Sequence, residues 1–572
     1  MDSYRAEFEI WKSSPVFDEE TRRELESLTD EKEIEDRFYK ELEFGTAGLR
    51  GIMGAGTNRI NRYTVGKATM GLANYLFETD PETKKKGVVI AFDTRNNSTS
   101  LARNTADVLT AMGIPVYLFD QPVPTPVLSF AVRHFGTASG IVLTASHNPP
   151  AYNGYKVYDP RGYQLGIEEA EAVLKKVGEI EDWGAIPTKG DDSLLTMVGD
   201  EVLDVFTNAV LRQSTLKDAA AKKALKLVFT PIHGTGRKPV LQILEKDGFT
   251  DVTVVAEQKM PDGNFPTVKS PNPEERGALM MGIRLAQTIG ADLVIGTDPD
   301  ADRIGCAVAH EGEMLLLTGN QVGALLVDYL LKTKTVLGEN PTVLTTIVTS
   351  DLGEAVAKKH GCNVKKVLTG FKFIGEKITE YEAAQMAGEK GVPNFLLGYE
   401  ESYGYLAGTH ARDKDAVVAA MLIAEMAAFH KTQGRTLAEA LKTLYDEYGF
   451  YLDKVESFSL QGKEGLERIG QIMTEIRSDE SFLPGVEKVA DYSKGIDSLP
   501  VSNVLKFHLA GGSWVVARPS ARSPRSSSTT AFVKRIRKRR KKLWLPFRRS
   551  FAKSASFHKE KSVVWQSQAT LF

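Results

Sequence analysis

The chain has 572 residues, which at roughly 100 to 200 residues per domain predicts three to five domains. Its hydrophobic fraction of 42% and charged fraction of 26% are ordinary for a globular protein, and no apolar run approaches the ~18 to 20 residues of a membrane-spanning helix. The charged N-terminal segment "MDSYRAEFEIWKSSP" lacks the apolar stretch of a signal peptide, so we expect a cytoplasmic protein with no membrane partner.

The net charge of -2 conceals two regions of opposite charge. Residues 521–572 hold 15 Lys and Arg against one Glu, whereas the rest of the chain holds 57 Lys and Arg against 73 Asp and Glu. Taken alone, this basic tail suggests a nucleic-acid partner. The tail offers Trp544 and Phe547 but no recognisable binding module, and the acidic remainder would oppose a phosphate backbone. A nucleic-acid-binding function is therefore the weaker alternative, because charge runs alone are poor evidence for it.

From about Lys86 onward, short β-branched runs alternate with helical segments, a pattern that favours an α/β fold with mostly parallel sheets covered by helices. Strands are predicted over residues 85–95, 115–119, 140–147, 224–236, 251–258, 291–298, 341–350 and 364–370, and helices over 238–249 and 352–361. The segment 415–431 is apolar nearly all round, which predicts a buried helix. Cys306 and Cys362 lie in strand-like segments without metal-ligand spacing, so we expect two buried thiols.

Ligand groups in open α/β sheets collect beyond the carboxyl ends of strands, so we examined the loops at those ends. In "GIVLTASHNPPAYNGYKVY", Ser146 and His147 follow a predicted strand directly, and Asn148 and two prolines precede a second strand. A serine on such a turn can present its hydroxyl as a nucleophile, with an imidazole and main-chain N–H groups beside it for a phosphate. Taken alone, this motif is better explained as a simple Ser/Asn turn with ordinary capping.

The segment "ADLVIGTDPDADRIG" places Asp298, Asp300 and Asp302 at alternate positions after an apolar strand, where an extended loop would turn all three carboxylates to one side. Three clustered carboxylates repel one another, and a hard divalent ion such as Mg²⁺ is their natural partner. A calcium-binding EF-hand would need Gly and Glu where Arg303 and Ala309 stand, which excludes that loop. An aspartyl phosphatase and a solvated acidic turn remain alternatives.

Further along the chain, "LLGYEESYGYLAG" brings Glu400, Glu401 and Ser402 together between glycines, a composition that suits the paired hydroxyls of a sugar or a plain acidic turn. Three cationic side chains, each a weak signal alone, stand in other loops: Arg50, His233 and Lys372. Together these loops supply a nucleophile, a metal site, a hydroxyl-reading loop and cations, which is what phosphoryl transfer to and from a sugar requires.

The loops "FGTAGLRG", "TASHNP", "GTDPDADR", "TGFKFI", "GYEESYG" and "ARPS" resemble, in this order, the signature loops of the α-D-phosphohexomutases. The similarity covers about Leu42 to Ser520 and is greatest to the bacterial phosphoglucomutase branch of the phosphoglucomutases and phosphomannomutases. It implies a four-domain α/β architecture, with three related mixed α/β domains and a smaller C-terminal α+β domain that is incomplete here. The expected bounds are 1–205, 206–317, 318–445 and 446–520, followed by the tail at 521–572.

The resemblance also implies roles for individual residues. Catalysis would fall to Ser146, as the phosphoserine, and to His147, Arg50, Lys156 and Lys414. Mg²⁺ would be held by Ser146, Asp298, Asp300 and Asp302. Substrate binding would fall to Arg303, Lys372, Glu400, Ser402, Arg518 and Ser520.

The implied reaction interconverts glucose 1-phosphate and glucose 6-phosphate through glucose 1,6-bisphosphate, which also acts as the activator. Phosphomannomutase or phosphopentomutase activity is the alternative, because sequence alone does not locate the contacts that read the sugar. The expected partners are small sugar phosphates, and the sequence predicts no oligomeric state.

After "ARPS" the family pattern continues as a phosphate-binding loop, Gly-Thr-Glu-Pro-Lys, then a strand and a last helix, and this chain has none of them. Codons can be chosen for Ser520 to Lys534 such that one inserted G yields SGTEPKIKFYYCVRE, which restores the loop and an alternating strand. The same shift turns the basic block from Lys534 to Trp544 into EKDQEAAEEAV, a strong helix-forming sequence. We therefore expect residues from Ala521 onward to be an out-of-frame translation, through a deletion or a sequencing error, with little to bury in a core.

Overall fold

The computed structural model describes residues 3–42, 48–455, 459–460, 462–479, 482–496, 498–519 and 527–528. The chain divides into two compact units, residues 1–449 and 450–572, and each is described by itself. Within the described ranges, none of the helices has both the length and the apolar character needed to cross a membrane.

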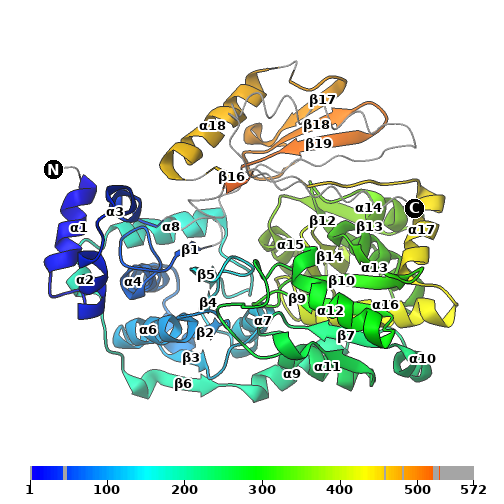
Figure 1. Ribbon diagram of the computed structural model, residues 1–572, viewed down its shortest axis with the longest axis horizontal. Coiled ribbons are helices and arrows are strands. Elements are labelled where there is room, and N and C mark those ends of the chain that lie inside the picture. The colour runs from blue at the N-terminus through cyan, green and yellow to red at the C-terminus, as the bar shows by residue number, and fades with distance from the viewer. Residues whose placement is uncertain are drawn as a thin grey trace. The chain divides into compact units, whose positions relative to one another are not determined.

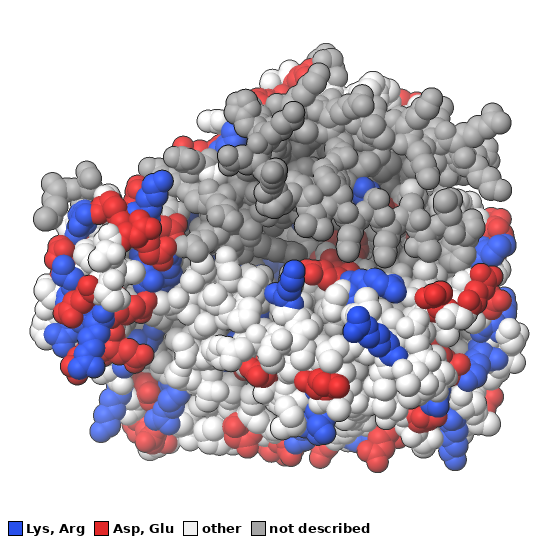
Figure 2. Space-filling view, in the orientation of Figure 1, with Lys and Arg blue, Asp and Glu red and all other residues white. Residues whose placement is uncertain are grey.

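The first unit begins with three short helices, α1 (Ser3–Ser13), α2 (Glu19–Glu26) and α3 (Glu31–Phe38), at one edge of the unit (Figure 1). They enclose an aromatic cluster in which Trp11 stacks on Phe17 and meets Tyr63 of α4 (Arg62–Thr79) edge-on. Acidic and basic side chains are intermixed on the outer surface of these helices (Figure 2), so this edge carries no patch of a single sign. The N-terminal segment is therefore a cap packed onto the first sheet's helices.

The first sheet has the strand order β1-β5-β4-β2-β3-β6. Its strands are β1 (Leu49–Ile52), β2 (Val88–Phe92), β3 (Val116–Phe119), β4 (Ser139–Leu143), β5 (Tyr152–Tyr158) and β6 (Leu195–Val198). The helices of this region after α4 are α5 (Thr83–Lys86), α6 (Ser98–Ala111), α7 (Thr125–Phe135), α8 (Ile167–Gly178) and α9 (Asp200–Leu211). Helices α4, α6 and α8 pack together over a core drawn from β2, β4 and β5.

The second sheet has the order β11-β10-β9-β7-β8. Its strands are β7 (Leu227–Thr230), β8 (Val252–Val254), β9 (Leu293–Thr297), β10 (Ile304–His310) and β11 (Glu313–Leu317), and its helices are α10 (Ala219–Ala224), α11 (Arg237–Lys246) and α12 (Arg276–Ile289). Cys306 in β10 and Cys362, which lies just before a strand of the third sheet, are both buried free thiols, as predicted.

The third sheet has the order β13-β12-β14-β15. Its strands are β12 (Pro341–Thr346), β13 (Asn363–Val367), β14 (Asn394–Tyr399) and β15 (Tyr405–Leu406), and its helices are α13 (Gly319–Thr333), α14 (Leu352–Lys359), α15 (Phe371–Met386), α16 (Ala416–Thr432) and α17 (Leu437–Tyr448). Helix α16 is buried along almost its whole length, which confirms the prediction made from its apolar sequence.

Each of the three sheets is parallel at its centre and antiparallel at one edge, so the prediction of mostly parallel sheets is only partly right. Strands β4, β9 and β14 each pair in parallel with a central strand, and the next strand in the chain returns beside each of them in antiparallel orientation. The loops that follow these strands are too short for the crossover of a dozen or more residues that a parallel return needs. The three returns make the three domains alike.

The second unit is the small α+β region expected after the three sheets. Strands β17 (Val486–Asp491), β18 (Leu505–Leu509) and β19 (Ser513–Ala517) form an antiparallel sheet, and α18 (Gly462–Ser478) packs on it through residues that include Ile472 and Ile476. A second pairing joins β16 (Ser459–Leu460) to β20 (Ser527–Ser528). The rest of the tail, residues 521–526 and 529–572, lies outside the described residues, so the predicted lack of a core there is not tested.

Candidate active site

Three loops in the first unit, each beyond the carboxyl end of a parallel strand, carry most of the predicted site residues. The Ser146 loop (residues 144–151) joins β4 to β5, the Asp298 loop (298–303) joins β9 to β10, and the Glu400 loop (400–404) joins β14 to β15. Each loop has one non-glycine residue with left-handed backbone: Ser146 at φ 53°, Ala301 at φ 46° and Tyr403 at φ 63°. Such a conformation is costly for these residues and is found where a turn must be tight.

The nucleophile candidate of the first sheet meets the acidic loop of the second. The Ser146 hydroxyl donates a hydrogen bond of 2.8 Å to Oδ2 of Asp298, and its oxygen is 3.2 Å from Nδ1 of His147. Ser146 is buried and His147 is half-buried. Residues 152 positions apart in the sequence are thus brought together, as the predicted site required.

The three aspartates form a buried cluster in which one oxygen of each lies within 4.8 Å of the others. The loop is a turn through Ala301 rather than the extended segment we predicted. It closes on itself, because Oδ1 of Asp298 accepts hydrogen bonds from the backbone N–H groups of Asp302 and Arg303. The turn therefore gathers the carboxylates by a local chain reversal rather than by strand-like alternation.

The charge balance of this cluster fits a bound divalent cation. Burial and the neighbouring carboxylates of Asp300 and Asp302 raise the pKa of Asp298 well above its usual value. Burial opposes ionisation of Asp300 as well, but the ammonium of Lys156, 2.9 Å from its Oδ2, holds the pKa of Asp300 far below the usual value. The Oδ1 atoms of Asp300 and Asp302 are buried without a hydrogen-bond partner, which leaves oxygen ligands of the kind that Mg²⁺ prefers.

Three further cations surround the aspartates. Lys414, after the Glu400 loop, places its Nζ 3.1 Å from Oδ2 of Asp302. Arg303 pairs with Glu274 and has Nε 3.7 Å from Oδ1 of Asp302; burial opposes its charge, yet these carboxylates raise its pKa. Arg50, in β1, is half-buried, and desolvation lowers its pKa while Asp300 opposes the shift. Positive charge therefore gathers from all three sheets.

The Glu400 loop contacts the start of β10, directly after the Asp298 loop, because the N–H of Ile304 donates to the carbonyl of Tyr403 at 3.1 Å. Glu400 is buried and accepts a hydrogen bond from the N–H of Gly370 at 3.1 Å, while Ser402 donates to Glu401. Lys372, in the first turn of α15, is buried, and its Nζ lies 3.2 Å from the carbonyl oxygen of Leu165 in the first domain.

Some residues of the site were missed by the sequence analysis. Thr125 begins α7 and makes two hydrogen bonds to Asp300, each of 2.9 Å. Its N–H donates to the Asp300 carbonyl, and its hydroxyl donates to Oδ2. Asp413 binds Lys414 and accepts a hydrogen bond of 2.6 Å from the Tyr158 hydroxyl. Asp93 and Arg95 follow β2 and hold the Ser146 loop; the strand-end rule applied to "FDTR" could have found these two. No local signal marks the others.

The three remaining predicted residues are His233, Arg518 and Ser520. His233 bonds through its two ring nitrogens to the carbonyl of Met260 and the hydroxyl of Thr267, so it is engaged within the second domain's own loops. Arg518 follows β19 in the second unit. Ser520, like residues 44–47 of the first signature loop, lies outside the described residues.

Comparison with known proteins gives matches along most of the chain. Family models described as phosphoglucomutase/phosphomannomutase alpha/beta/alpha domains I, II and III match residues 41–182, 204–312 and 318–448. The phosphoglucomutase of Staphylococcus haemolyticus is 36% identical over 86% of this chain and 90% of the relative, and that of Staphylococcus epidermidis strain ATCC 12228 is 36% identical over 89% and 94%.

Solved structures match the fold over a similar share. A putative phosphomannomutase from Thermus thermophilus has a TM-score of 0.64 at 23% identity and covers 90% of this chain and 98% of its own. A phosphoglucomutase/phosphomannomutase family protein from Burkholderia thailandensis has a TM-score of 0.66 at 18% identity and covers 90% and 97%. At these identities the likeness concerns the fold.

Proposed function

The chain belongs to the α-D-phosphohexomutase superfamily, and from this premise we propose that it interconverts glucose 1-phosphate and glucose 6-phosphate. Membership makes it a phosphohexomutase, an intramolecular phosphotransferase of the isomerase class that acts on sugar phosphates. The choice of glucose is supported by the curated Staphylococcus relatives, which are phosphoglucomutases at 36 to 37% identity.

The observation that carries the proposal is the meeting of Ser146 with the aspartate cluster. A hydroxyl that donates to Asp298, beside carboxylate oxygens without hydrogen-bond partners, has the surroundings that a phosphoryl carrier needs. Mg²⁺ held by Asp298, Asp300 and Asp302 would neutralise charge on the serine phosphate. An aspartyl phosphatase accounts less well for the geometry, because it leaves the buried Ser146 hydroxyl without a role.

In the forward reaction, the free hydroxyl of the hexose phosphate attacks phosphorus while the bond between phosphorus and Oγ of phosphorylated Ser146 breaks. The sugar hydroxyl loses one proton and the leaving Oγ gains one, so there is no net change in protons. The product is a bound 1,6-bisphosphate and a serine hydroxyl. After the bisphosphate reverses its orientation in the site, Oγ of Ser146 attacks the other phosphorus, and the sugar oxygen that leaves takes a proton. Lys156, Lys414, Arg50 and Arg303 stabilise the transferring oxygens, and His147 lies within reach of Oγ to share its proton.

The sugar would be read by Glu400 and Ser402, with Lys372 and Arg518 binding phosphate. Glucose 1,6-bisphosphate is the expected activator, because it phosphorylates Ser146 directly. Mannose or pentose phosphates are the alternatives, and a panel of these substrates under equal conditions separates them.

The test is a direct measurement of the phosphoenzyme and of turnover. Purified protein incubated with Mg²⁺ and glucose 1,6-bisphosphate should gain one phosphoryl group, located by mass spectrometry on the peptide that contains Ser146. With a trace of the bisphosphate, the protein should convert glucose 1-phosphate to glucose 6-phosphate. An undiminished rate in Ser146→Ala would overturn the mechanism, and faster turnover of another sugar phosphate would overturn the choice of glucose.

We also propose that the sequence after Ser520 is read out of frame. The support is the recovery of loop, strand and helix in family order by one inserted base, and the acidic character that the same shift gives to the basic block. If the deletion is real, the chain keeps Arg518 and Ser520 but lacks the Gly-Thr turn whose N–H groups would hold the distal phosphate. The bisphosphate should then escape more readily, so turnover falls while Ser146 is still phosphorylated.

Two measurements test this proposal. Resequencing the gene across the codons for Arg518 to Arg525 should reveal codons that yield the shifted reading; codons incompatible with it would end the idea. A gene with the one base restored should encode a protein of higher turnover than the present chain, with an unchanged rate of Ser146 phosphorylation. Equal turnover of the two proteins would show that the altered C-terminus does not impair the reaction.

A further inference from the structure

Ser146 is held in an uncommon backbone conformation, and its surroundings explain how. Its φ of 53° lies in the left-handed region, which non-glycine residues occupy only when neighbouring groups enforce it. The backbone N–H of Ser146 donates to the Thr144 hydroxyl at 2.8 Å, and the backbone carbonyl accepts from a guanidinium N–H of Arg95. Both sides of the strained residue are therefore fixed by side chains.

Arg95 collects backbone carbonyls from one short stretch of chain. Its two terminal nitrogens donate to the carbonyls of Ser146, Asn148, Pro149 and Tyr152. An arginine has donors in a fixed planar fork, so it can organise several acceptors at once, which a lysine ammonium on a flexible stem does less well. This guanidinium therefore defines the path of the whole loop and not only one residue.

Asp93 completes the arrangement. Its Oδ2 accepts from the hydroxyl of Thr144 at 2.7 Å and lies 3.4 Å from Nε of Arg95, and its Oδ1 accepts from the N–H of Arg95 and from Ser98. The side chains of Asp93 and Arg95 are fully buried. Burial lowers the pKa of Arg95 to about 10, which leaves the guanidinium charged at neutral pH. Thr144, Asp93 and Arg95 thus form one network of hydrogen bonds, part of it charge-assisted, that binds both backbone groups of Ser146.

The second domain covers this arrangement. The ring centroid of the fully buried Phe265 lies 5.1 Å from the guanidinium carbon of Arg95, and Asn96 donates to Asn264 at 2.9 Å. Excluding water from a charged group strengthens its hydrogen bonds. The loop that carries Ser146 is therefore stiffened by the same domain that supplies Asp298.

We propose that Arg95 is a positioning residue for Ser146, whose guanidinium holds the loop so that Oγ is directed at Asp298 and at the transferring phosphorus. The inference rests on the proposed mutase function. Replacing the guanidinium lets the backbone of Ser146 relax toward common conformations, which moves Oγ away from the reacting position. Phosphoryl transfer then slows, whereas the affinity for the sugar bisphosphate changes little, because Arg95 touches none of the proposed substrate-binding side chains among its described contacts.

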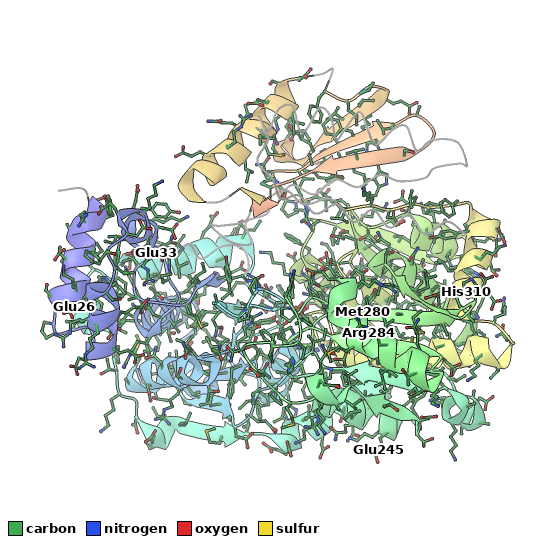
Figure 3. The ribbon with its side chains drawn as sticks, viewed as in Figure 1. Glu26, Glu33, Glu245, Met280, Arg284 and His310 are labelled. Atoms are coloured by element: carbon green, nitrogen blue, oxygen red, sulfur yellow. The ribbon has the colours of Figure 1, made fainter. Side chains whose placement is uncertain are left out.

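A matched control is available in Arg59. This arginine is also buried, donates to the backbone carbonyls of Asp36 and Asn58, and pairs with the carboxylates of Asp36 and Glu33. Its described side-chain contacts are with Asp36, Asn58 and Glu33, the last of which Figure 3 labels, and none of these residues belongs to the three loops. Arg59→Lys therefore reproduces the loss of a buried guanidinium without disturbing Ser146.

The experiment compares the full-length chain with Arg95→Lys and Arg59→Lys in the presence of Mg²⁺. Rapid mixing with glucose 1,6-bisphosphate over a range of concentrations, followed by intact-mass analysis, gives the rate constant for Ser146 phosphorylation and the apparent dissociation constant. We expect the rate constant of Arg95→Lys to fall about 50-fold, with the dissociation constant changed less than about threefold, a loss typical of misplaced catalytic groups. Arg59→Lys should keep both values within about twofold.

A second readout needs no bound metal or substrate. Hydrogen exchange of the backbone in residues 144–152 should become faster in Arg95→Lys and stay unchanged in Arg59→Lys. Methylguanidinium added to Arg95→Ala should restore part of the lost rate, whereas the same concentration of sodium chloride should not.

The proposal is overturned if Arg95→Lys phosphorylates Ser146 within threefold of the unsubstituted chain, or if Arg59→Lys loses as much. Unchanged exchange in residues 144–152 would also overturn it. If the unsubstituted chain itself never becomes phosphorylated on Ser146, the proposed function fails, and this inference fails with it.

Discussion

The Ser146 loop and the Asp298 loop begin at the same point of two similarly connected sheets, yet they are held in different ways. The Asp298 loop is closed mainly by its own atoms, since the N–H groups of Asp302 and Arg303 donate to Asp298 and the N–H of Ala301 donates to the carbonyl of Asp298. The Ser146 loop depends on Arg95, which reaches it from the end of β2.

The residue with left-handed backbone also differs in kind. In the Asp298 loop it is Ala301, which supplies no side-chain ligand, so the strain is separated from the chemistry. In the Ser146 loop it is the proposed nucleophile itself. A loop that gathers fixed ligands can be self-contained, whereas a loop that aims one reacting oxygen needs support from outside.

The largest expected effect comes from removing one carboxylate charge from the Asp298 loop while keeping its turn. Asp298→Asn keeps an oxygen that can accept from the N–H groups of Asp302 and Arg303, so the turn should persist while the proposed metal site loses one carboxylate charge. Because a bound metal contributes several kcal/mol to charge stabilisation, turnover should fall about 1,000-fold. Removal of metal from the unsubstituted chain with EDTA should cause a comparable loss, reversed by Mg²⁺. Steady-state assays measure both, and activity within tenfold of the unsubstituted chain would contradict the assignment.

The next effect concerns the acid sensitivity of folding stability, which we attribute to a buried histidine outside the three loops. Burial, with Arg435 and Lys332 nearby, lowers the pKa of His430 in α16 to about 4, so the unfolded chain takes up the proton between pH 6.5 and pH 4 and the folded chain does not. Because the pKa of His430 is lowered in the folded chain, the free energy of unfolding decreases as the pH falls through this window, by about 2 to 3 kcal/mol at pH 4.5.

His430→Phe should remove this part of the acid sensitivity. Calorimetric melting at pH 7.5 and pH 4.5 should show a smaller loss of melting temperature in the variant than in the unsubstituted chain. Equal losses would mean that His430 is protonated in the folded protein. The variant would also let the pH dependence of phosphoryl transfer be followed to lower pH before the body unfolds.

A pair of threonine substitutions sharpens the comparison further. Thr144 accepts from the N–H of Ser146 and donates to Asp93, whereas the hydroxyl of Thr297, just before the Asp298 loop, is buried without a hydrogen-bond partner. Thr144→Val should slow Ser146 phosphorylation about tenfold, because a buried N–H left unpaired costs about 1 to 3 kcal/mol. Thr297→Val should leave the rate within twofold. Similar rates in the two variants would mean that the loops are held alike.

The smallest expected effect concerns the strain at Ala301. Ala301→Gly removes the penalty of left-handed backbone, about 1 to 2 kcal/mol, but adds freedom to the unfolded chain worth about 0.5 to 1 kcal/mol. The free energy of unfolding should therefore rise by about 0 to 1.5 kcal/mol, and turnover should stay within twofold. Chemical denaturation measures the free energy of unfolding, and a steady-state assay measures turnover. A large loss of activity would show that the Asp298 loop also needs conformational rigidity.

The sequence predicted the features that depend on near neighbours. The aspartate cluster, the central strands and the buried helix α16 follow from local composition, and all are present. The extended form of the Asp298 loop was predicted wrongly, because a left-handed Ala301 has no marker in composition. Thr125 and Tyr158 were missed because their partners are 175 and 255 positions away, at distances that only the folded chain closes. Arg95 stands at the end of a predicted strand, so the strand-end rule could have found it, although its role depends on a partner 51 positions away. The expected domain bounds and the individual roles of the site residues stay predictions.

Helix α7 has a mechanical consequence for how the first unit can work. Its first residue, Thr125, is bonded to Asp300 in the second domain, and near its other end Arg133 is bonded to the carbonyls of Thr409 and His410 in the third. A helix of eleven residues is stiff over its length, so it ties both attachments to one rigid body. Sliding any of the three domains by the length of a hydrogen bond would break contacts at one end of α7. The three loops are therefore fixed in mutual register, and in the proposed reaction the bisphosphate would have to reverse its two ends against a frame that does not yield.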